Sequence, residues 1–188
     1  DGSINEEAGP ISLGERLSAT VTPTGYRAAY NKGVWVVHML RMLMRQSGAN
    51  PDATFLKMIR EFVETYKGKN ASTWDFKHLA EKYMTSALDL RGDSKLDWFF
   101  DQWVFATGIP AYRLDYKVEP ARNAFIVSGK IKRAGVYDNF TMPIPLYGDD
   151  IFLGQVPMGD AEGKFQFQVT KKPERVIIDP HGTILTRP

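Results

Sequence analysis

The amino-acid sequence predicts an α+β protein of two domains, an N-terminal helical bundle followed by an antiparallel β-sandwich. Apolar residues recur at helical spacing from about residue 26 to residue 108. Beyond that stretch they alternate with polar residues, which is the period of a β-strand. The 188 residues suffice for one large or two small domains, and 43% hydrophobic residues allow a packed core. We therefore predict a loop or linker over 1–24, helices over 25–110 and the sandwich over 111–188.

The N-terminal segment and the first helix differ sharply in composition. Residues 1–24 are rich in Gly, Pro, Ser, Thr and acidic residues and show little periodicity, which is typical of a loop. The first predicted helix includes residues 34–44, which are apolar on every side except mainly at His38 and Arg41. Such a helix must be enclosed by other elements. We expect three further helices to surround it, with some cover provided by residues upstream of this sequence.

Three amphipathic helices follow the first. The second is expected to begin with Asn50 as its N-cap, and its apolar face consists of Phe55, Met58, Ile59, Phe62, Val63 and Tyr66. The third has Ser72 and Asp75 at the spacing of a capping box, and its apolar face consists of Phe76, Leu79, Ala80, Tyr83 and Ala87. The fourth is expected to start with Ser94 as its cap and to end at Gly108. Its apolar residues are Leu96, Phe99, Phe100 and Trp103.

The remaining chain is predicted to form short strands. Apolar residues stand at alternate positions in the first two strands, namely Tyr112, Leu114, Tyr116 and Val118, then Phe125, Val127, Gly129 and Ile131. Further strands are expected near 140–147, 151–156, 164–169, 175–178 and 183–186. Gly, Pro, Asn and Asp separate them. Strands of this length and spacing predict an antiparallel sandwich of about seven strands.

Composition excludes several classes of function. With 24 basic and 22 acidic residues, the net charge of +2 leaves no surplus of cations for nucleic acid, so we expect no nucleic-acid partner. No run approaches the ~18 apolar residues of a membrane span, so we expect none. The absence of cysteine excludes a disulfide framework, a thiolate metal site and a cysteine nucleophile. The compartment is left open.

The histidines do not predict a metal site. A zinc protease typically pairs two histidines four positions apart on a helix, with a carboxylate as a further ligand. His38, His78 and His181 form no such pair. We interpret His38 as a hydrogen-bonded core residue, His78 as a helix-surface residue and His181 as part of a turn. The residues of this chain are therefore expected to bind no metal.

One polar cluster stands where the first helix begins. Tyr30 is followed by Asn31, Lys32 and Gly33, and the buried part of the helix comes next. A tyrosine at the mouth of a buried helix can hold its phenol at the edge of a cleft. Alternatively, the ring anchors the N-terminus of the helix, which the spacing alone favours.

In several places the sequence resembles the membrane-alanyl aminopeptidase (gluzincin) family of zinc metallopeptidases. The run Tyr30-x-Lys32-Gly33 with His38-Met39-Leu40-Arg41 resembles the segment downstream of the family's zinc site. The run Trp98 to Val104, followed by Thr107-Gly108-Ile109-Pro110, is similar to the end of its catalytic domain. The order and distance of these runs match, and the family also has a β-sandwich after its helices. The resemblance covers roughly residues 23–188.

This resemblance implies that the chain is the C-terminal part of a zinc-dependent aminopeptidase-like metallopeptidase that hydrolyses peptide bonds with zinc-activated water. Tyr30 matches the tyrosine that donates a hydrogen bond to the oxyanion. The family's H-E-x-x-H helix, its glutamate ligand and its G-x-M-E-N loop are absent here and are expected before Asp1. The parent protein would then use zinc and a peptide substrate, while this chain alone would bind no zinc and be inactive.

Two other hypotheses stay open beside the peptidase fragment. The chain could be a non-enzymatic protein-interaction module on the same scaffold, or an independent helical-plus-sandwich binding domain. For the fragment we expect apolar surface on the first helix, around Trp35, Val36, Met39 and Leu43. That surface would be covered by the missing N-terminal half or by self-association.

Overall fold

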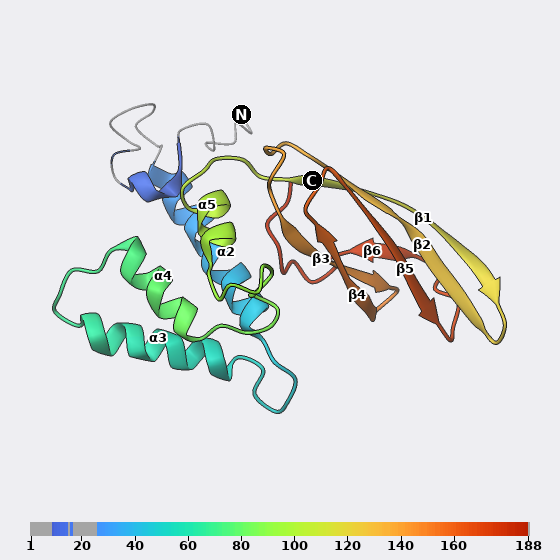
Figure 1. Ribbon diagram of the computed structural model, residues 1–188, viewed down its shortest axis with the longest axis horizontal. Coiled ribbons are helices and arrows are strands. Elements are labelled where there is room, and N and C mark those ends of the chain that lie inside the picture. The colour runs from blue at the N-terminus through green and yellow to red at the C-terminus, as the bar shows by residue number, and fades with distance from the viewer. Residues whose placement is uncertain (1–8, 15, 17–25, 188) are drawn as a thin grey trace. The chain divides into compact units, whose positions relative to one another are not determined.

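The computed structural model describes residues 9–14, 16 and 26–187 and shows a mixed α+β protein. The chain divides into two compact units, Asp1–Thr107 and Gly108–Pro188, which we call the helical unit and the β unit. In its described part the helical unit contains four α-helices, and the β unit contains two antiparallel sheets of three strands each (Figure 1). Within the described ranges, no helix combines the length and the apolar character needed to cross a membrane.

The helical unit buries part of each predicted apolar face, but Val63, expected on the apolar face of the second helix, is 58% exposed. Its elements are η2 (Ile11–Leu13), α2 (Tyr26–Met44), α3 (Ala53–Tyr66), α4 (Thr73–Lys82) and α5 (Asp97–Trp103). The four apolar residues predicted for the last helix, from Leu96 to Trp103, are all buried. Most of the predicted loop or linker over 1–24 lies outside the described residues. Its described part includes the short helix η2, where Ser12 N donates to the carbonyl of Val104 over 3.1 Å.

The burial pattern of α2 differs from the expectation. Val36, Met39 and Leu43, expected on exposed apolar surface, are only 0–6% exposed, because the helical unit itself covers that side of α2. Of the four residues named, only Trp35 is exposed. The exposed apolar side chains of α2 instead include Val34 and Val37.

The helix ends confirm one sequence prediction and correct two. At α4, Asp75 N donates to Ser72 Oγ over 3.2 Å and Ser72 N donates to Asp75 Oδ2 over 2.8 Å, which is the expected capping box. Asn50 is not the N-cap of α3; that position is Asp52. Ser94 is not the cap of α5 either. Its φ of 56° is left-handed, its N–H donates to Asp89, and α5 starts after Leu96.

The β unit contains six named strands. They are β1 (Ala111–Ala121), β2 (Ala124–Ala134), β3 (Met142–Gly148), β4 (Ile151–Met158), β5 (Glu162–Val169) and β6 (Val176–Ile178). One sheet has the order β1-β2-β5 and the other β4-β3-β6, and all named pairs are antiparallel. On β1, Arg113, Lys117 and Glu119 are exposed, and on β2, Val127, Ile131 and Arg133 are buried. The antiparallel arrangement is thus as the alternation predicts.

The seventh predicted strand, at 183–186, does not form. The carboxylate of Asp179 instead accepts hydrogen bonds from Thr183 N over 2.9 Å and Ile184 N over 2.8 Å. These bonds curl the chain into a turn, so its backbone cannot join a sheet edge. Just after this segment, Arg187 forms an isolated parallel β-bridge with Ala111.

The two sheets of the β unit contact each other along β4 and β5. A Cβ at Gly154 would lie 2.5 Å from the ring of Phe167, so only a glycine lets this ring pack onto β4. Elsewhere the phenol of Tyr116 on β1 accepts a hydrogen bond from Val176 N at the start of β6, over 3.2 Å. Apolar residues between these contacts form the core of the unit; the fully buried ones include Val127, Ile131, Ile144 and Leu146.

Candidate functional site

Tyr30, the candidate catalytic residue of the sequence analysis, lies near the start of α2. Its side chain is 67% exposed. A tyrosine that anchors a helix N-terminus would bury its ring against the core, so this exposure disfavours the anchoring interpretation. The phenol is at the surface of the helical unit, where it can approach another molecule or another part of a larger protein.

Lys32 anchors the same stretch of α2 to the core. It is only 7% exposed, and its ammonium donates to the carbonyl of Ala106 over 3.3 Å. The ammonium also lies 5.9 Å from the ring centroid of Trp103, within the range of a cation–π contact. A buried ammonium is costly unless it is paired in this way. These contacts hold Lys32, two residues from Tyr30, to Trp103 on α5 and to Ala106 just after that helix.

One face of α2 carries exposed apolar side chains in line with Tyr30. Tyr30, Val34 and Val37 follow the i, i+4, i+7 spacing of one helix face, and we call them the α2 stripe. Val34 is 70% exposed and Val37 is 39% exposed. Beside the stripe, the partly exposed Trp35 ring packs edge-on against His38 with 5.6 Å between centroids. Exposed apolar side chains at this spacing make the α2 stripe a candidate interaction surface.

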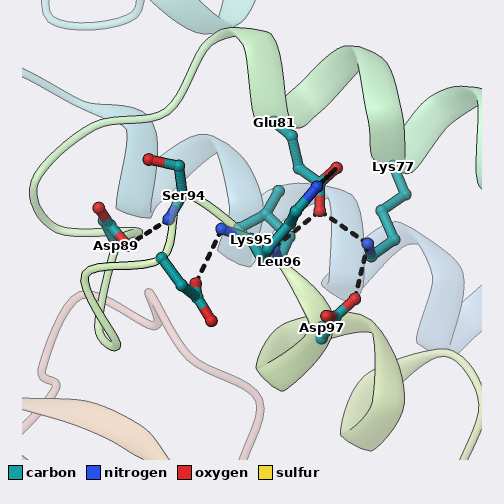
Figure 2. A network of polar contacts seen from close by, with 8 residues as sticks. Lys77, Glu81, Asp89, Ser94, Lys95, Leu96 and Asp97 are labelled. Carbon is teal, nitrogen blue, oxygen red and sulfur yellow. Dashed lines mark hydrogen bonds and ion pairs between the residues drawn. The ribbon is translucent and has the colours of Figure 1, made fainter.

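A buried lysine joins α4 to the start of α5. Lys77 Nζ donates to Glu81 Oε1 over 2.7 Å and forms an ion pair with Asp97 Oδ1 over 2.7 Å. Glu81 Oε1 also accepts from Leu96 N over 3.0 Å. Figure 2 shows Lys77 and Glu81 reaching from one helix towards Asp97 on the next. We call Lys77, Glu81 and Asp97 the lysine network. The network holds the start of α5, and Trp103 at the end of α5 makes the cation–π contact with Lys32.

All three groups of the lysine network favour their charged forms. Burial alone would lower the pKa of Lys77, but hydrogen bonds to Asp97 and Glu81 outweigh burial and raise it. The hydrogen bond from Lys77 lowers the pKa of Asp97. Burial opposes the charge of Glu81, yet the bonds from Leu96 N and Lys77 together lower its pKa. The network is thus a fully ionised structural element.

Sequence reasoning missed this network. Lys77 and Glu81 stand four residues apart on a predicted helix, which is the one signal available in the sequence. Such pairs are usually exposed and weak. Lys77 is instead 4% exposed, because Asp97 and the start of α5 cover it from a distant part of the chain.

The three histidines do not come together. His38 is half-buried on α2, His78 is exposed on α4, and His181 is exposed in the turn after β6. Among the residues that the structure describes, no group of three or more His, Cys, Asp or Glu side chains is placed to hold a metal ion.

No protein-family model matches this chain, and a comparison with curated proteins finds no match. The proposed function therefore depends on the position of Tyr30 and on the resemblance of the sequence to the gluzincin family.

Proposed function

We propose that this chain is the C-terminal part of a zinc-dependent aminopeptidase-like metallopeptidase of the gluzincin type, and that it is inactive alone. In this proposal the helical unit ends the catalytic domain as a helical bundle, and the two sheets form the following β-sandwich. The observation that carries the proposal is the position of Tyr30, whose phenol is exposed while the buried Lys32 holds the adjacent backbone.

The chemistry proposed for Tyr30 follows from that position. In the parent protein, zinc held by residues outside this sequence would supply activated water. The Tyr30 hydroxyl would donate a hydrogen bond to the oxygen of the scissile carbonyl as negative charge develops on it. A neutral donor held in place stabilises the transition state more than the planar substrate, and so contributes to kcat. The contact of Lys32 with Ala106 supports this role, because it fixes the backbone two residues from Tyr30.

The exposed α2 stripe is consistent with a second polypeptide that packs on this face of α2. Each Å² of apolar surface removed from water contributes roughly 25 cal/mol, so covering Tyr30, Val34 and Val37 stabilises a complex by several kcal/mol. In the fragment proposal this polypeptide is the N-terminal half of the parent protein, which carries the zinc ligands. Tyr30 would then lie at the edge of the interface with that half. In the isolated chain a second copy would take its place.

The exposed stripe also favours the second candidate, a non-enzymatic protein-interaction module on the same scaffold. The two proposals differ in what precedes this sequence. An H-E-x-x-H helix with a downstream glutamate in the parent coding sequence supports the peptidase, and their absence supports the interaction module. Biochemically, the peptidase proposal expects the parent protein to cleave an aminoacyl-nitroanilide and to lose this activity on dialysis against a chelator. A parent that carries zinc and cleaves no peptide substrate would contradict it.

A further inference from the structure

The β unit has one edge strand without the usual protection against pairing. β1, β4, β5 and β6 are the edge strands of the described sheets. Edge strands are normally blunted by charges, prolines, bulges or shortness. β1 carries alternating charges and Pro120, β4 contains Pro157 and a bulge, and β6 has only three residues. From Phe165 to Val169, β5 contains no charge and no proline, and its register with β2 is continuous.

A cavity of about 490 Å³ opens beside the unprotected end of β5. One wall consists of Ile151, Phe152 and Leu153 at the start of β4, and the other of Gln168, Val169 and the turn over 170–173. Figure 1 shows β4 and β5 diverging from the connection that joins them, with these two ends furthest from it. The volume is within the usual range for ligand pockets.

The β4 side of the cavity cannot supply a regular pairing edge. Leu146 pairs with Gly154 and Tyr147 pairs with Phe152, so Leu153 is an extra residue in β4. A bulge of this kind interrupts the ladder and bends the strand. The edge strand with a regular register beside the cavity is therefore β5, while β4 contributes apolar side chains. Ile151 and Phe152 are 64% and 53% exposed.

Charges stand at both ends of the cavity. Lys171 and Lys172 are exposed on the turn after β5, and in the described part of the chain neither has an ion pair. Across the cavity, the Asp149 carboxylate is occupied by hydrogen bonds from Glu174 N and Arg175 N, each over 3.1–3.2 Å. The two lysines thus offer positive charge to an occupant, whereas Asp149 is already engaged and the exposed Asp150 adds one negative charge at the other end.

We propose that an extended peptide segment of a partner protein pairs with the C-terminal half of β5 and fills this cavity. Its backbone continues the β1-β2-β5 sheet, which is strand addition to an open edge. Alternate side chains of the segment point towards Phe152 and Leu153 and are apolar, while those between them face the polar side beside Gln166 and Gln168. An acidic residue of the segment lies against Lys171 and Lys172. This binding site is independent of the peptidase proposal.

The test is selection of a random heptapeptide library, displayed on phage, against the immobilised full chain. We expect enrichment of sequences that alternate apolar and polar residues and contain Asp or Glu. A synthetic copy of the dominant peptide should shift the backbone amide signals of Gln168 and Val169 in NMR spectra. Absence of an enriched motif, or shifts confined to the helical unit, would overturn the proposal.

Three variants of the chain make the test specific. Phe152→Ala should weaken binding of the selected peptide by roughly tenfold, since the ring forms the apolar wall. The double variant Lys171→Glu/Lys172→Glu should invert the preference from acidic to basic peptides, an outcome that misfolding cannot produce. Tyr137→Ala is the matched control, because this 38% exposed aromatic of the β unit does not line the cavity. Equal binding to all three variants would contradict the proposed site.

Discussion

At the scale of single residues, the Tyr30 hydroxyl tests the proposed chemistry most directly. In the parent protein, Tyr30→Phe should leave folding and zinc content unchanged, because the ring is 67% exposed and only a hydroxyl is removed. We expect kcat to fall by roughly 10²–10³, the usual effect of deleting one oxyanion donor. Steady-state kinetics on an aminoacyl substrate checks this. A change confined to KM would make Tyr30 a binding residue instead.

Lys77 is the residue whose loss should affect the fold of the helical unit most. Lys77→Met leaves Glu81 and Asp97 without their cation, and Glu81 is itself only 9% exposed. Breaking a buried ion pair from one side costs about 3 kcal/mol, so the free energy of unfolding obtained from urea denaturation should fall by about that amount. Lys95→Met is the control, because Lys95 is 56% exposed and 4.0 Å from Glu81. An equal effect of both substitutions would show that the buried contact is unimportant.

The lysine network also predicts how stability depends on pH. The pKa values of Asp97 and Glu81 are lowered in the folded protein, so the unfolded chain binds protons more readily in acid. Their contribution is present above the ordinary carboxyl pKa of about 4 and is lost as pH falls through the lower folded values. The raised pKa of Lys77 adds stability that is lost only in strong alkali. Urea midpoints should therefore fall more steeply below about pH 4 in the wild type than in Lys77→Met.

At the scale of elements, the capping box at α4 is a local feature with a local cost. Ser72→Ala removes the acceptor of Asp75 N, and we expect the helical unit to lose about 1 kcal/mol of unfolding free energy. Thermal or urea denaturation measures this loss. Ser72→Thr, which keeps the capping hydroxyl, should retain most of the stability; if it loses as much as Ser72→Ala, the loss does not come from the hydroxyl.

The sequence predicted well those features whose structure depends on residues nearby in the chain. Periodicity located the buried face of α5, and the spacing of Ser72 and Asp75 identified a cap, because both depend on residues within a turn or two. Asn50 and Ser94 were wrong as caps because contacts outside the helix decide where it starts, such as the bond from Ser94 N to Asp89. The strand expected at 183–186 failed for a similar reason, since Asp179 captures its backbone donors.

The same distinction applies to the candidate site. Tyr30 could be named from the sequence, but its exposure could not, because the spacing alone favoured a buried anchor. The burial of Lys77 depends on α5 arriving from twenty residues further along the chain, at Asp97. Likewise, the sequence did not indicate which face of α2 is exposed. The structure shows that Val36, Met39 and Leu43 are buried, so the exposed apolar face is the α2 stripe.

At the scale of the whole molecule, the α2 stripe predicts association of the isolated chain. Val34 and Val37 are exposed apolar residues, so a second copy should bury them when no other partner is present. Sedimentation velocity at concentrations between about 1 and 100 μM should show a sedimentation coefficient that rises with concentration. Val34→Asp/Val37→Asp should restore a monomer, whereas the helix-surface control Val63→Asp on α3 should not. A wild-type chain that is monomeric throughout would remove this support for a missing partner.

The connections of the β unit have a consequence for its assembly during synthesis. β1 and β2 form a local hairpin, whereas β2 meets its other neighbour, β5, only after the chain has passed through residues 135–161 and the hairpin of β3 and β4. Local pairings form quickly, and distant ones wait for the chain. On the ribosome, the inner edge of β2 therefore stays uncovered until β5 has emerged. Nascent chains that stall in this interval expose an apolar strand edge to one another, so slowed translation between β2 and β5 should increase aggregation of the product.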